Sequence, residues 1–156
     1  MILKLNYIII PLIAIFVSVF GGQLVNSGMQ WYQTIKLPSL APAGSIIGMV
    51  WTVIFIFCTI AALIIWNKFP RSNRFNLIIA IFLINAFLNV FWNFLFFANQ
   101  WLMAGIIEMI ILEITTLILI FLIWPQSKLV GVLLIPYALW VPFATYLATQ
   151  IFLLNR

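Results

Sequence analysis

Five long apolar stretches dominate the sequence and leave few folds open to it. They lie near residues 7–25, 43–66, 75–98, 101–124 and 129–154. Each is long enough for the roughly 20 residues that a helix needs to cross a lipid bilayer, and the whole chain is 67% hydrophobic but only 6% charged. The sequence therefore predicts an all-α membrane protein, a five-transmembrane-helix bundle that forms a single domain over residues 1–156.

The connections between these stretches predict how the helices are arranged. Residues 26–42 form the one long connection, whereas 67–74, 99–100 and 125–128 are short enough to make successive helices antiparallel neighbours. The first stretch could instead be a signal peptide, but no A-x-A-like cleavage site closes it.

Five spans place the two termini on opposite sides, so the basic residues divide between the sides of the membrane. Those on the side of the N-terminus are Lys4, Lys68, Arg71, Arg74 and Lys128, and those on the other side are Lys36 and Arg156. Because cytoplasmic connections carry an excess of Lys and Arg, this division favours a bacterial cell membrane with a cytoplasmic N-terminus. The scattered basic residues form no patch of the kind that binds nucleic acid.

Small residues recur every four positions in two of the spans. Ala14, Ser18 and Gly22 share one face of the first span, and Gly44 and Gly48 share a face of the second. This pattern lets membrane helices approach closely. It predicts either close packing within the bundle or a dimer interface.

The residues that are missing restrict the chemistry. The chain has no His and a single Cys, Cys58, so it lacks the usual zinc ligands, a Cys-His dyad and a His ligand for haem iron. The only acids, Glu108 and Glu113, are five residues apart and project about 140° apart on a helix, so they do not form an acid/base pair. Glu108 shares a stripe with Thr115, which could be its structural partner, and a proton-coupled transporter could also use such carboxylates.

Six of the seven tryptophans fall into two groups by their depth in the membrane. Trp66, Trp101 and Trp124 lie at the ends of spans, as expected of residues that anchor a helix at the membrane surface. Trp51, Trp92 and Trp140 lie within spans, where an indole N–H finds no polar partner in lipid, so we expect them to face inward.

Helical projection groups each of these inward tryptophans with other residues. The three stripes are Gly48, Trp51, Phe55, Cys58 and Ala62 in the second span; Asn85, Asn89, Trp92, Asn93 and Phe96 in the third; and Pro136, Trp140, Ala144 and Leu147 in the fifth. The stripes are compatible with ordinary core packing and hydrogen bonds between helices. Flat rings beside small residues also suit a pocket for a planar apolar ligand.

Several motifs resemble the TspO/MBR family, the tryptophan-rich sensory proteins related to the mitochondrial translocator protein. They are WY at 31–32, LPSLAP at 37–42, GMVWT at 48–52, NAFLNVFWNFLFF at 85–97 and LLIPYALWVPFATYL at 133–147. The resemblance implies a five-helix bundle, usually a homodimer, with a pocket that opens towards the first loop. It also implies binding of porphyrins and of synthetic isoquinoline- and benzodiazepine-type ligands, and in some bacterial members light-dependent degradation of protoporphyrin.

The family resemblance also assigns roles to individual residues. Trp51 and Trp140 match pocket tryptophans and would be the catalytic residues if the protein is photo-oxidative, while Glu108 lies where members often carry an acid. Together, the stripes and the resemblance predict a ligand-binding set of Tyr32, Pro42, Trp51, Phe55, Asn85, Asn89, Trp92, Trp140, Ala144 and Leu147. The prediction includes no metal site and no covalently bound cofactor.

The sequence also departs from the family pattern. Leu37, Leu40 and Ala43 replace a Lys, a Trp and a Pro of the usual loop, and the sterol-binding motif of animal members fails because nine residues separate Tyr146 from Arg156. Cholesterol binding is therefore not expected. The sequence predicts a protein that binds protoporphyrin-type tetrapyrroles as a sensor, a scavenger or a weak light-dependent porphyrin-degrading protein. The alternatives are a transporter of porphyrins or other small apolar molecules, or a membrane signalling scaffold.

Overall fold

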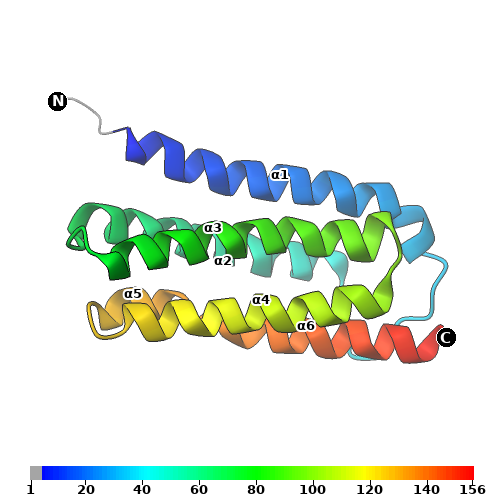
Figure 1. Ribbon diagram of the computed structural model, residues 1–156. Helices are drawn as coiled ribbons and strands as arrows, with labels where there is room; N and C mark the ends of the chain where they lie inside the picture. The colour runs from blue at the N-terminus through cyan, green and yellow to red at the C-terminus, as the bar shows by residue number, and fades with distance from the viewer. Residues whose placement is uncertain (1–4) are drawn as a thin grey trace.

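The computed structural model describes residues 5–156 and shows an all-helical chain (Figure 1). The helical segments are α1 (Asn6–Tyr32), α2 (Gly44–Lys68), α3 (Asn73–Asn93), the π-helical turn η1 (Phe94–Ala98), α4 (Leu102–Ile123), α5 (Lys128–Leu133) and α6 (Ile135–Leu154). Because η1 continues α3 and α6 continues α5, they make five helices long and apolar enough to cross a membrane. The predicted five-helix membrane bundle is confirmed.

The first helix is longer than its apolar stretch. We expected the long connection to cover residues 26–42, but α1 continues to Tyr32 and the connection is residues 33–43. The polar and small residues 26–28 looked like loop residues by composition. They remain helical because this part of α1 packs against α3 and η1, and tertiary packing overrides weak local propensity.

The third span ends in a π-turn. The Asn99 N–H donates to the Phe94 carbonyl at 3.0 Å, a bond five residues long, and the wider turn buries three consecutive residues, Leu95 to Phe97. Gln100 then takes a left-handed conformation with φ 59° and turns the chain into α4. Such π-turns are found frequently at functional sites.

The fifth span is divided where its sequence contains a proline. Pro136 lies in the first turn of α6 and has no backbone N–H to continue the hydrogen-bond ladder of α5. Leu134 separates the two helices and serves as the C-cap of α5 and the N-cap of α6. Helix α2 packs against α5 and meets α6 through side chains such as Trp51 and Tyr137.

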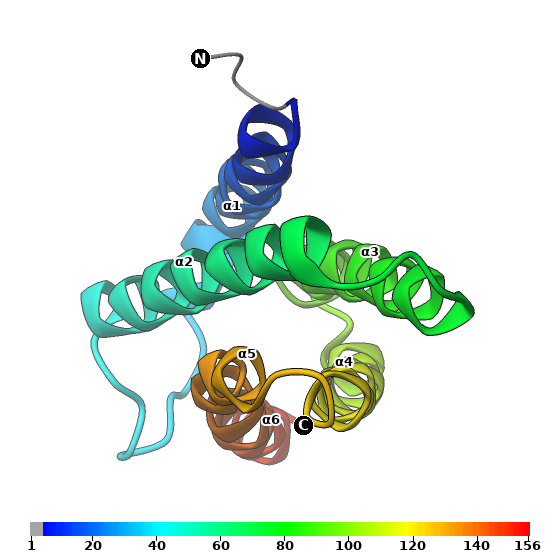
Figure 2. The same ribbon diagram turned by 90° about the vertical axis from the view of Figure 1, so that its left-hand side faces the viewer.

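The helices pack unevenly around the bundle. α4 packs against α3 and α6, whereas α1 packs against α2, α3 and η1. Figure 2 shows the N-terminal part of α1 leaning away from the layer formed by α2 and α3. This divergence creates room beside α1 in the half of the membrane where the chain begins.

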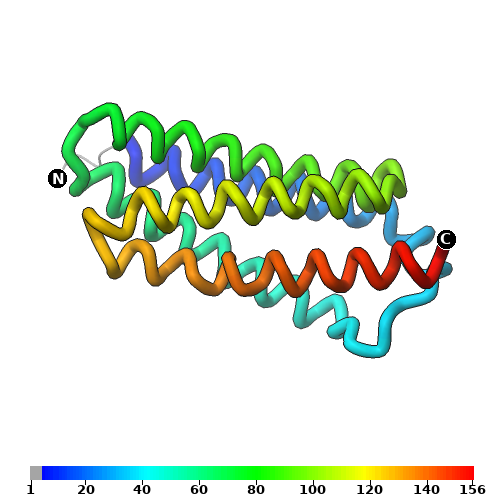
Figure 3. Tube along the Cα trace, turned by 60° about the horizontal axis from the view of Figure 1, so that its bottom comes forward, coloured from blue at the N-terminus to red at the C-terminus, as the bar shows by residue number. Residues whose placement is uncertain are grey.

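The two ends of the bundle differ in charge. The end that holds residues 69–72 and 124–127, here called the basic end, carries Lys68, Arg71, Arg74 and Lys128. The opposite end, here called the long-loop end, carries residues 33–43 and the C-terminus (Figure 3), including Lys36 and Arg156. Lys4 lies outside the described residues. An apolar core between α2, α3, α4 and α5 closes the basic end, with Ile65, Ile78 and Ile123 fully buried.

Close packing of α1 uses glycines other than the predicted ones. A Cβ on Gly21 would lie 3.1 Å from the Asn93 side-chain nitrogen, and one on Gly28 would collide with the backbone of Phe97 in η1. A Cβ on Gly22, Gly44 or Gly48 would meet nothing within 4 Å. Within this chain, the predicted small-residue faces at these three glycines are therefore not sites of close helix packing.

Candidate functional site

A cavity of about 480 Å³ occupies the half of the bundle nearest the long-loop end. Four walls enclose it: α1, α2, the end of α3 with η1, and α6. It is here called the tryptophan cavity, because Trp51, Trp92 and Trp140 each contribute from a different helix. Its volume lies within the range of about 300–1,000 Å³ typical of small-molecule sites.

Each of the three tryptophans is half-buried and held by a neighbouring ring. Between ring centroids, Trp51 lies 5.7 Å from Phe55 and 5.8 Å from Tyr137, which it meets edge to face. Trp92 stacks on Phe96 with a centroid distance of 5.0 Å. Trp140 lies 5.4 Å from Phe143. The edge-to-face pair of Trp51 and the stacked pair of Trp92 are favourable aromatic geometries, whereas Trp140 and Phe143 are tilted at 51° to one another.

Two indole N–H groups at this cavity have no protein partner. The Nε1 atoms of Trp92 and Trp140 are buried, and neither makes a hydrogen bond with any described residue. A buried donor without a partner costs about 1–3 kcal/mol. The Trp92 nitrogen lies on the side of Gly105 in α4, which is not part of the cavity wall.

The structure brings together most of the residues predicted to bind a ligand. Eight of the ten line the tryptophan cavity: Tyr32, Trp51, Phe55, Asn89, Trp92, Trp140, Ala144 and Leu147. Pro42 is in the connection beside the cavity and is not part of its lining. Asn85 is buried deeper and lines a different cavity.

Asn85 belongs to a hydrogen-bond network that joins three helices. Its Nδ2 donates to Thr115 at 2.8 Å and Thr116 at 3.0 Å on α4, and its Oδ1 accepts from the Tyr137 hydroxyl on α6 at 3.0 Å. Asn89 donates to the same hydroxyl at 3.1 Å. The asparagine stripe therefore links helices as well as lining cavities, and both the Nδ2 and the Oδ1 of Asn85 already have protein partners.

The expected pairing of Glu108 with Thr115 is wrong. The Thr115 hydroxyl accepts from Asn85 and donates to the Leu112 carbonyl, so its hydrogen bonds stay within the network. Glu108 is 3% exposed, and neither of its carboxyl oxygens has a hydrogen-bond partner among residues 5–156. An intramembrane acid in this position is a candidate functional group.

A single side chain ties the long connection to the C-terminal end of α6. The Lys36 backbone N–H donates to Asn155 Oδ1 at 2.9 Å, and Asn155 Nδ2 donates to the Lys36 carbonyl at 2.9 Å. Residues 33–43 connect Tyr32 to Gly44, which are both in the cavity wall. The paired bonds therefore latch a segment that adjoins the tryptophan cavity.

The α1 wall of this cavity was missed by the sequence analysis. Its members are Val17, Ser18, Gly21, Gly22, Val25, Asn26, Met29 and Tyr32, and only Tyr32 was predicted. The signal was present in the face shared by Ser18 and Gly22, which continues at helical spacing to Val25 and Met29. Small residues on such a face equally predict close packing or a dimer interface, so the pattern alone does not indicate a cavity wall.

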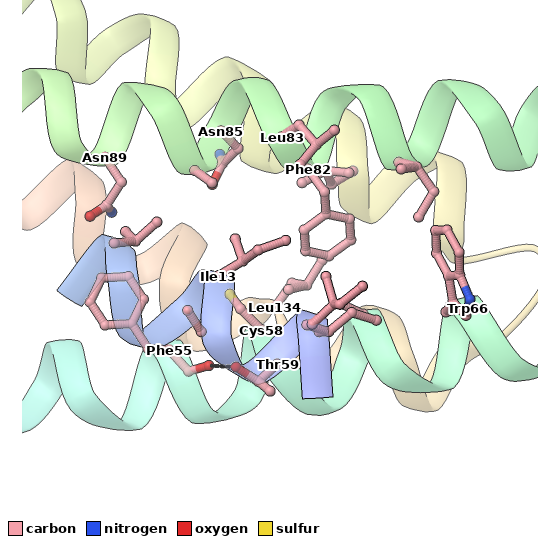
Figure 4. A pocket seen from close by; sticks show the side chains of 18 of the residues that line it. Ile13, Phe55, Cys58, Thr59, Trp66, Phe82, Leu83, Asn85, Asn89 and Leu134 are labelled. Atoms are coloured by element: carbon pink, nitrogen blue, oxygen red, sulfur yellow. Dashed lines mark hydrogen bonds between the residues drawn. The ribbon is translucent and has the colours of Figure 1, made fainter. Parts of the chain in front are cut away.

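A second cavity, here called the side cavity, lies towards the basic end (Figure 4). It has a volume of about 510 Å³ and lies mainly between the N-terminal half of α1, α2 and α3. Val17, Phe55 and Asn89 line both cavities. The two cavities therefore adjoin one another at these three side chains, about midway along the bundle.

Comparison with known proteins identifies relatives along nearly the whole chain. The model of the TspO/MBR family matches residues 8–154. The tryptophan-rich protein TspO of Bacillus cereus is 33% identical over 92% of this chain and 95% of its own length. The tryptophan-rich protein TspO of Archaeoglobus fulgidus is 34% identical over 99% and 98%, and the uncharacterised membrane protein YtaB of Bacillus subtilis is 30% identical over 94% and 97%.

Proposed function

Because the chain belongs to the TspO/MBR family, we propose that this multi-pass membrane protein binds a protoporphyrin-type tetrapyrrole in the tryptophan cavity. It acts there as a sensor or scavenger of the porphyrin, or degrades it weakly in light. The observation that carries the proposal is the convergence of three indoles from three helices on one cavity of about 480 Å³.

The walls of the tryptophan cavity suit a large flat ring. Trp51 and Trp140 supply aromatic surface from α2 and α6, and the nearby Gly48 and Ala144 leave space beside them. Aromatic rings bind one another in offset or edge geometry with centroids about 4.5–7 Å apart. A tetrapyrrole can make such contacts with several walls at once.

The polar groups at the cavity suit a ligand that carries hydrogen-bond acceptors. The residues described as lining it include no Lys, Arg or His, so ion pairs with a wall residue and axial ligation by imidazole do not contribute. The amide of Asn26 and the hydroxyl of Tyr32 line the cavity and can donate to carboxylate or carbonyl oxygens. Stacking and hydrogen bonds therefore hold the ligand, and metal-free protoporphyrin should bind at least as well as haem.

A light-dependent activity would use the ligand itself as the light absorber. The excited porphyrin is oxidised and dioxygen is reduced. The indole of Trp51 or Trp140 relays the electron: it loses one electron to dioxygen and regains one from the porphyrin, so it is not consumed. The protein contributes position and an easily oxidised side chain. This step needs neither an acid/base pair nor a protein-bound metal.

Titration of purified protein with metal-free protoporphyrin, in darkness and then in light, tests the proposal. Binding in darkness should saturate at one porphyrin per chain, and an isoquinoline- or benzodiazepine-type ligand should compete. A clear preference for haem with an axial-ligand spectrum would contradict the binding mode. Failure of any porphyrin to saturate the protein would reject the proposed ligand.

Conservative tryptophan variants separate binding from degradation. Trp51→Phe and Trp140→Phe keep an aromatic wall but remove the indole, so they should keep most of the affinity and lose light-dependent breakdown. Trp101→Phe is the matched control, because Trp101 is 57% exposed and lines neither cavity. If affinity and breakdown fall in the same proportion, the indoles serve only as walls. If free porphyrin bleaches as fast as bound porphyrin, the protein is not a catalyst.

Transport of small apolar molecules is a second candidate, favoured by the adjoining cavities. The tryptophan cavity and the side cavity share Val17, Phe55 and Asn89 and lie in opposite halves of the bundle. A transporter should move porphyrin across proteoliposome membranes, and Glu108→Gln should abolish any dependence on a proton gradient. If the protein retains bound porphyrin but no porphyrin crosses the proteoliposome membrane, transport is rejected and the binding function remains.

A further inference from the structure

We propose that the side cavity binds one acyl chain of an anionic phospholipid whose headgroup lies at the basic end. This cavity is separate from the tryptophan cavity and takes no part in the function proposed above. The argument rests on the lining, the length and the polar groups at one end of the side cavity.

Most of the lining of the side cavity is apolar. Ile10, Ile13, Phe82 and Leu119 are among the side chains that form it, and Ala14, Ala62 and Ala86 leave the space open. Apart from Asn6 at one end, the buried polar side chains in this wall have protein partners. Asn85 bonds to two threonines and a tyrosine, and the Thr59 hydroxyl donates to the Phe55 carbonyl at 2.7 Å. A satisfied wall requires no polar contact from its occupant, so a hydrocarbon fits it.

The side cavity opens towards the surrounding lipid. Ile9 and Ile13 of α1 and Leu83 of α3 line it, yet each is between 39% and 54% exposed. In a five-span protein these exposed apolar residues face bilayer hydrocarbon. The opening between α1 and α3 therefore admits molecules that already lie in the membrane.

The length of the side cavity matches one leaflet. Figure 4 shows Asn89 near one end and Trp66 near the other. Phe55, beside Asn89, is 11 residues from Trp66 on α2, which corresponds to about 16 Å at 1.5 Å per residue. Half of a hydrocarbon core of about 30 Å is about 15 Å. A chain that enters from the leaflet at the basic end would therefore reach the boundary with the tryptophan cavity.

Polar and cationic groups gather where a headgroup would lie. Asn6 lines the side cavity near the start of α1, and its buried Nδ2 has no hydrogen-bond partner among the described residues. The Arg71 guanidinium lies 4.6 Å from the centre of the Trp66 ring and donates to the Trp66 carbonyl at 2.8 Å. Both acids of the chain are in α4, so the basic end supplies no carboxylate for Arg71. A phosphate provides the anionic partner that Arg71 lacks among the described residues, and an ester carbonyl provides an acceptor for the Asn6 side chain.

Native mass spectrometry of the purified protein tests the proposal with equimolar dioleoyl phosphatidylglycerol and dioleoyl phosphatidylcholine. We expect one retained lipid per chain, with phosphatidylglycerol favoured by about fivefold, the ratio expected from one cation near an anionic headgroup. Arg71→Gln should remove the preference and Arg71→Lys should keep it. Lys128→Gln is the matched control at the same end and should keep it also. Equal retention of the two lipids by the unmodified chain would overturn the proposal.

Filling the cavity tests where the lipid binds. Ala86→Phe and, independently, Ala62→Phe should abolish lipid retention, whereas Ala80→Phe, on the exposed face of α3, should not. Size-exclusion profiles and thermal unfolding show whether each variant is folded. A folded Ala86→Phe protein that keeps the lipid would overturn the proposal. Displacement of the lipid by stoichiometric porphyrin would also overturn the proposal, because the cavity would then be the porphyrin site. Loss of a dimer when the cavity is filled would overturn it as well, because the cavity would then bind a second copy of the chain.

Discussion

Replacement of Gly28 by alanine tests whether close backbone contact between Gly28 and Phe97 holds α1 against η1. A Cβ at this buried position would collide with the Phe97 carbonyl and would lie 2.8 Å from the Phe97 Cα. Backbone atoms cannot rotate away as a side chain can, so α1 or η1 must move. Gly22 is the matched control on the same helix, since a Cβ there meets nothing within 4 Å.

The two substitutions should change stability in opposite directions. Alanine forms helix better than glycine by about 1 kcal/mol, so Gly22→Ala should be neutral or slightly stabilising. Gly28→Ala makes the same gain but overpacks a tight contact, which typically costs about 1–3 kcal/mol. We expect the Gly28 variant to be less stable than the Gly22 variant by about 1–3 kcal/mol.

The single cysteine provides the assay. Cys58 is the only thiol in the chain and is partly buried in α2, so a thiol-reactive dye reports its exposure on heating. For a chain of this size, each kcal/mol corresponds to about 2–4 °C in the unfolding midpoint. Equal unfolding midpoints for the two variants, or a higher midpoint for Gly28→Ala, would refute the close contact between α1 and η1 at Gly28.

Three further outcomes follow from the described contacts. Asn155→Ala removes the latch on residues 33–43, so porphyrin should associate and dissociate faster in stopped-flow measurements, and unchanged rates would show that this segment does not control access. Tyr137→Phe deprives two buried asparagines of a partner and should lower the free energy of unfolding by about 1–3 kcal/mol, a loss that is absent if water replaces the hydroxyl. A reporter fused after Arg156 should be extracytoplasmic and one inserted within residues 69–72 cytoplasmic, and the reverse pattern would reject the orientation.

The fold could be predicted from the sequence because the membrane imposes a simple length rule. Five apolar stretches gave five helices, and the tryptophans within spans turned towards the cavity. The end of α1 could not be predicted in this way, because residues 26–28 are helical through contact with η1. Hydropathy measures how readily a segment transfers from water into lipid, and it contains no information about a packing neighbour such as η1.

The candidate site was predicted one helix face at a time. Projection placed Asn85 and Asn89 on the same face, but it could not show that Tyr137 and two threonines satisfy the amide of Asn85. It also identified small residues on α1 without showing that the close contacts are made at Gly21 and Gly28. The side cavity depends on the tilt of α1 relative to α3, which no single-helix pattern specifies.

Hydrogen bonds divide the bundle into two parts. In α3, α4 and α6, here called the stitched wall, side-chain hydrogen bonds join the helices, and the other part is held by apolar contact. Side-chain bonds from Asn85 and Asn89 join α3 to α4 and α6. In α1 and α2, by contrast, the side-chain bonds from Ser27, Thr52, Thr59 and Asn67 go to carbonyls of their own helix. In lipid, such helices associate through packing alone, without a hydrophobic driving force between them. Both cavities have α1 and α2 on one side and the stitched helices on the other.

Ligands should therefore enter by displacement of α1, and most easily at its N-terminal half, where it leans away from the bundle (Figure 2). Amide hydrogen exchange in lipid nanodiscs should be faster in residues 6–17 than in residues 18–32, which include the contacts of Gly21 and Gly28, and slowest in α4. Local opening has a free energy that follows the contacts it breaks. Lipid occupancy of the side cavity should slow exchange in residues 6–17 and leave α4 unchanged. Uniform exchange along α1, or faster exchange in α4, would show that the stitched wall moves and that α1 is not the gate.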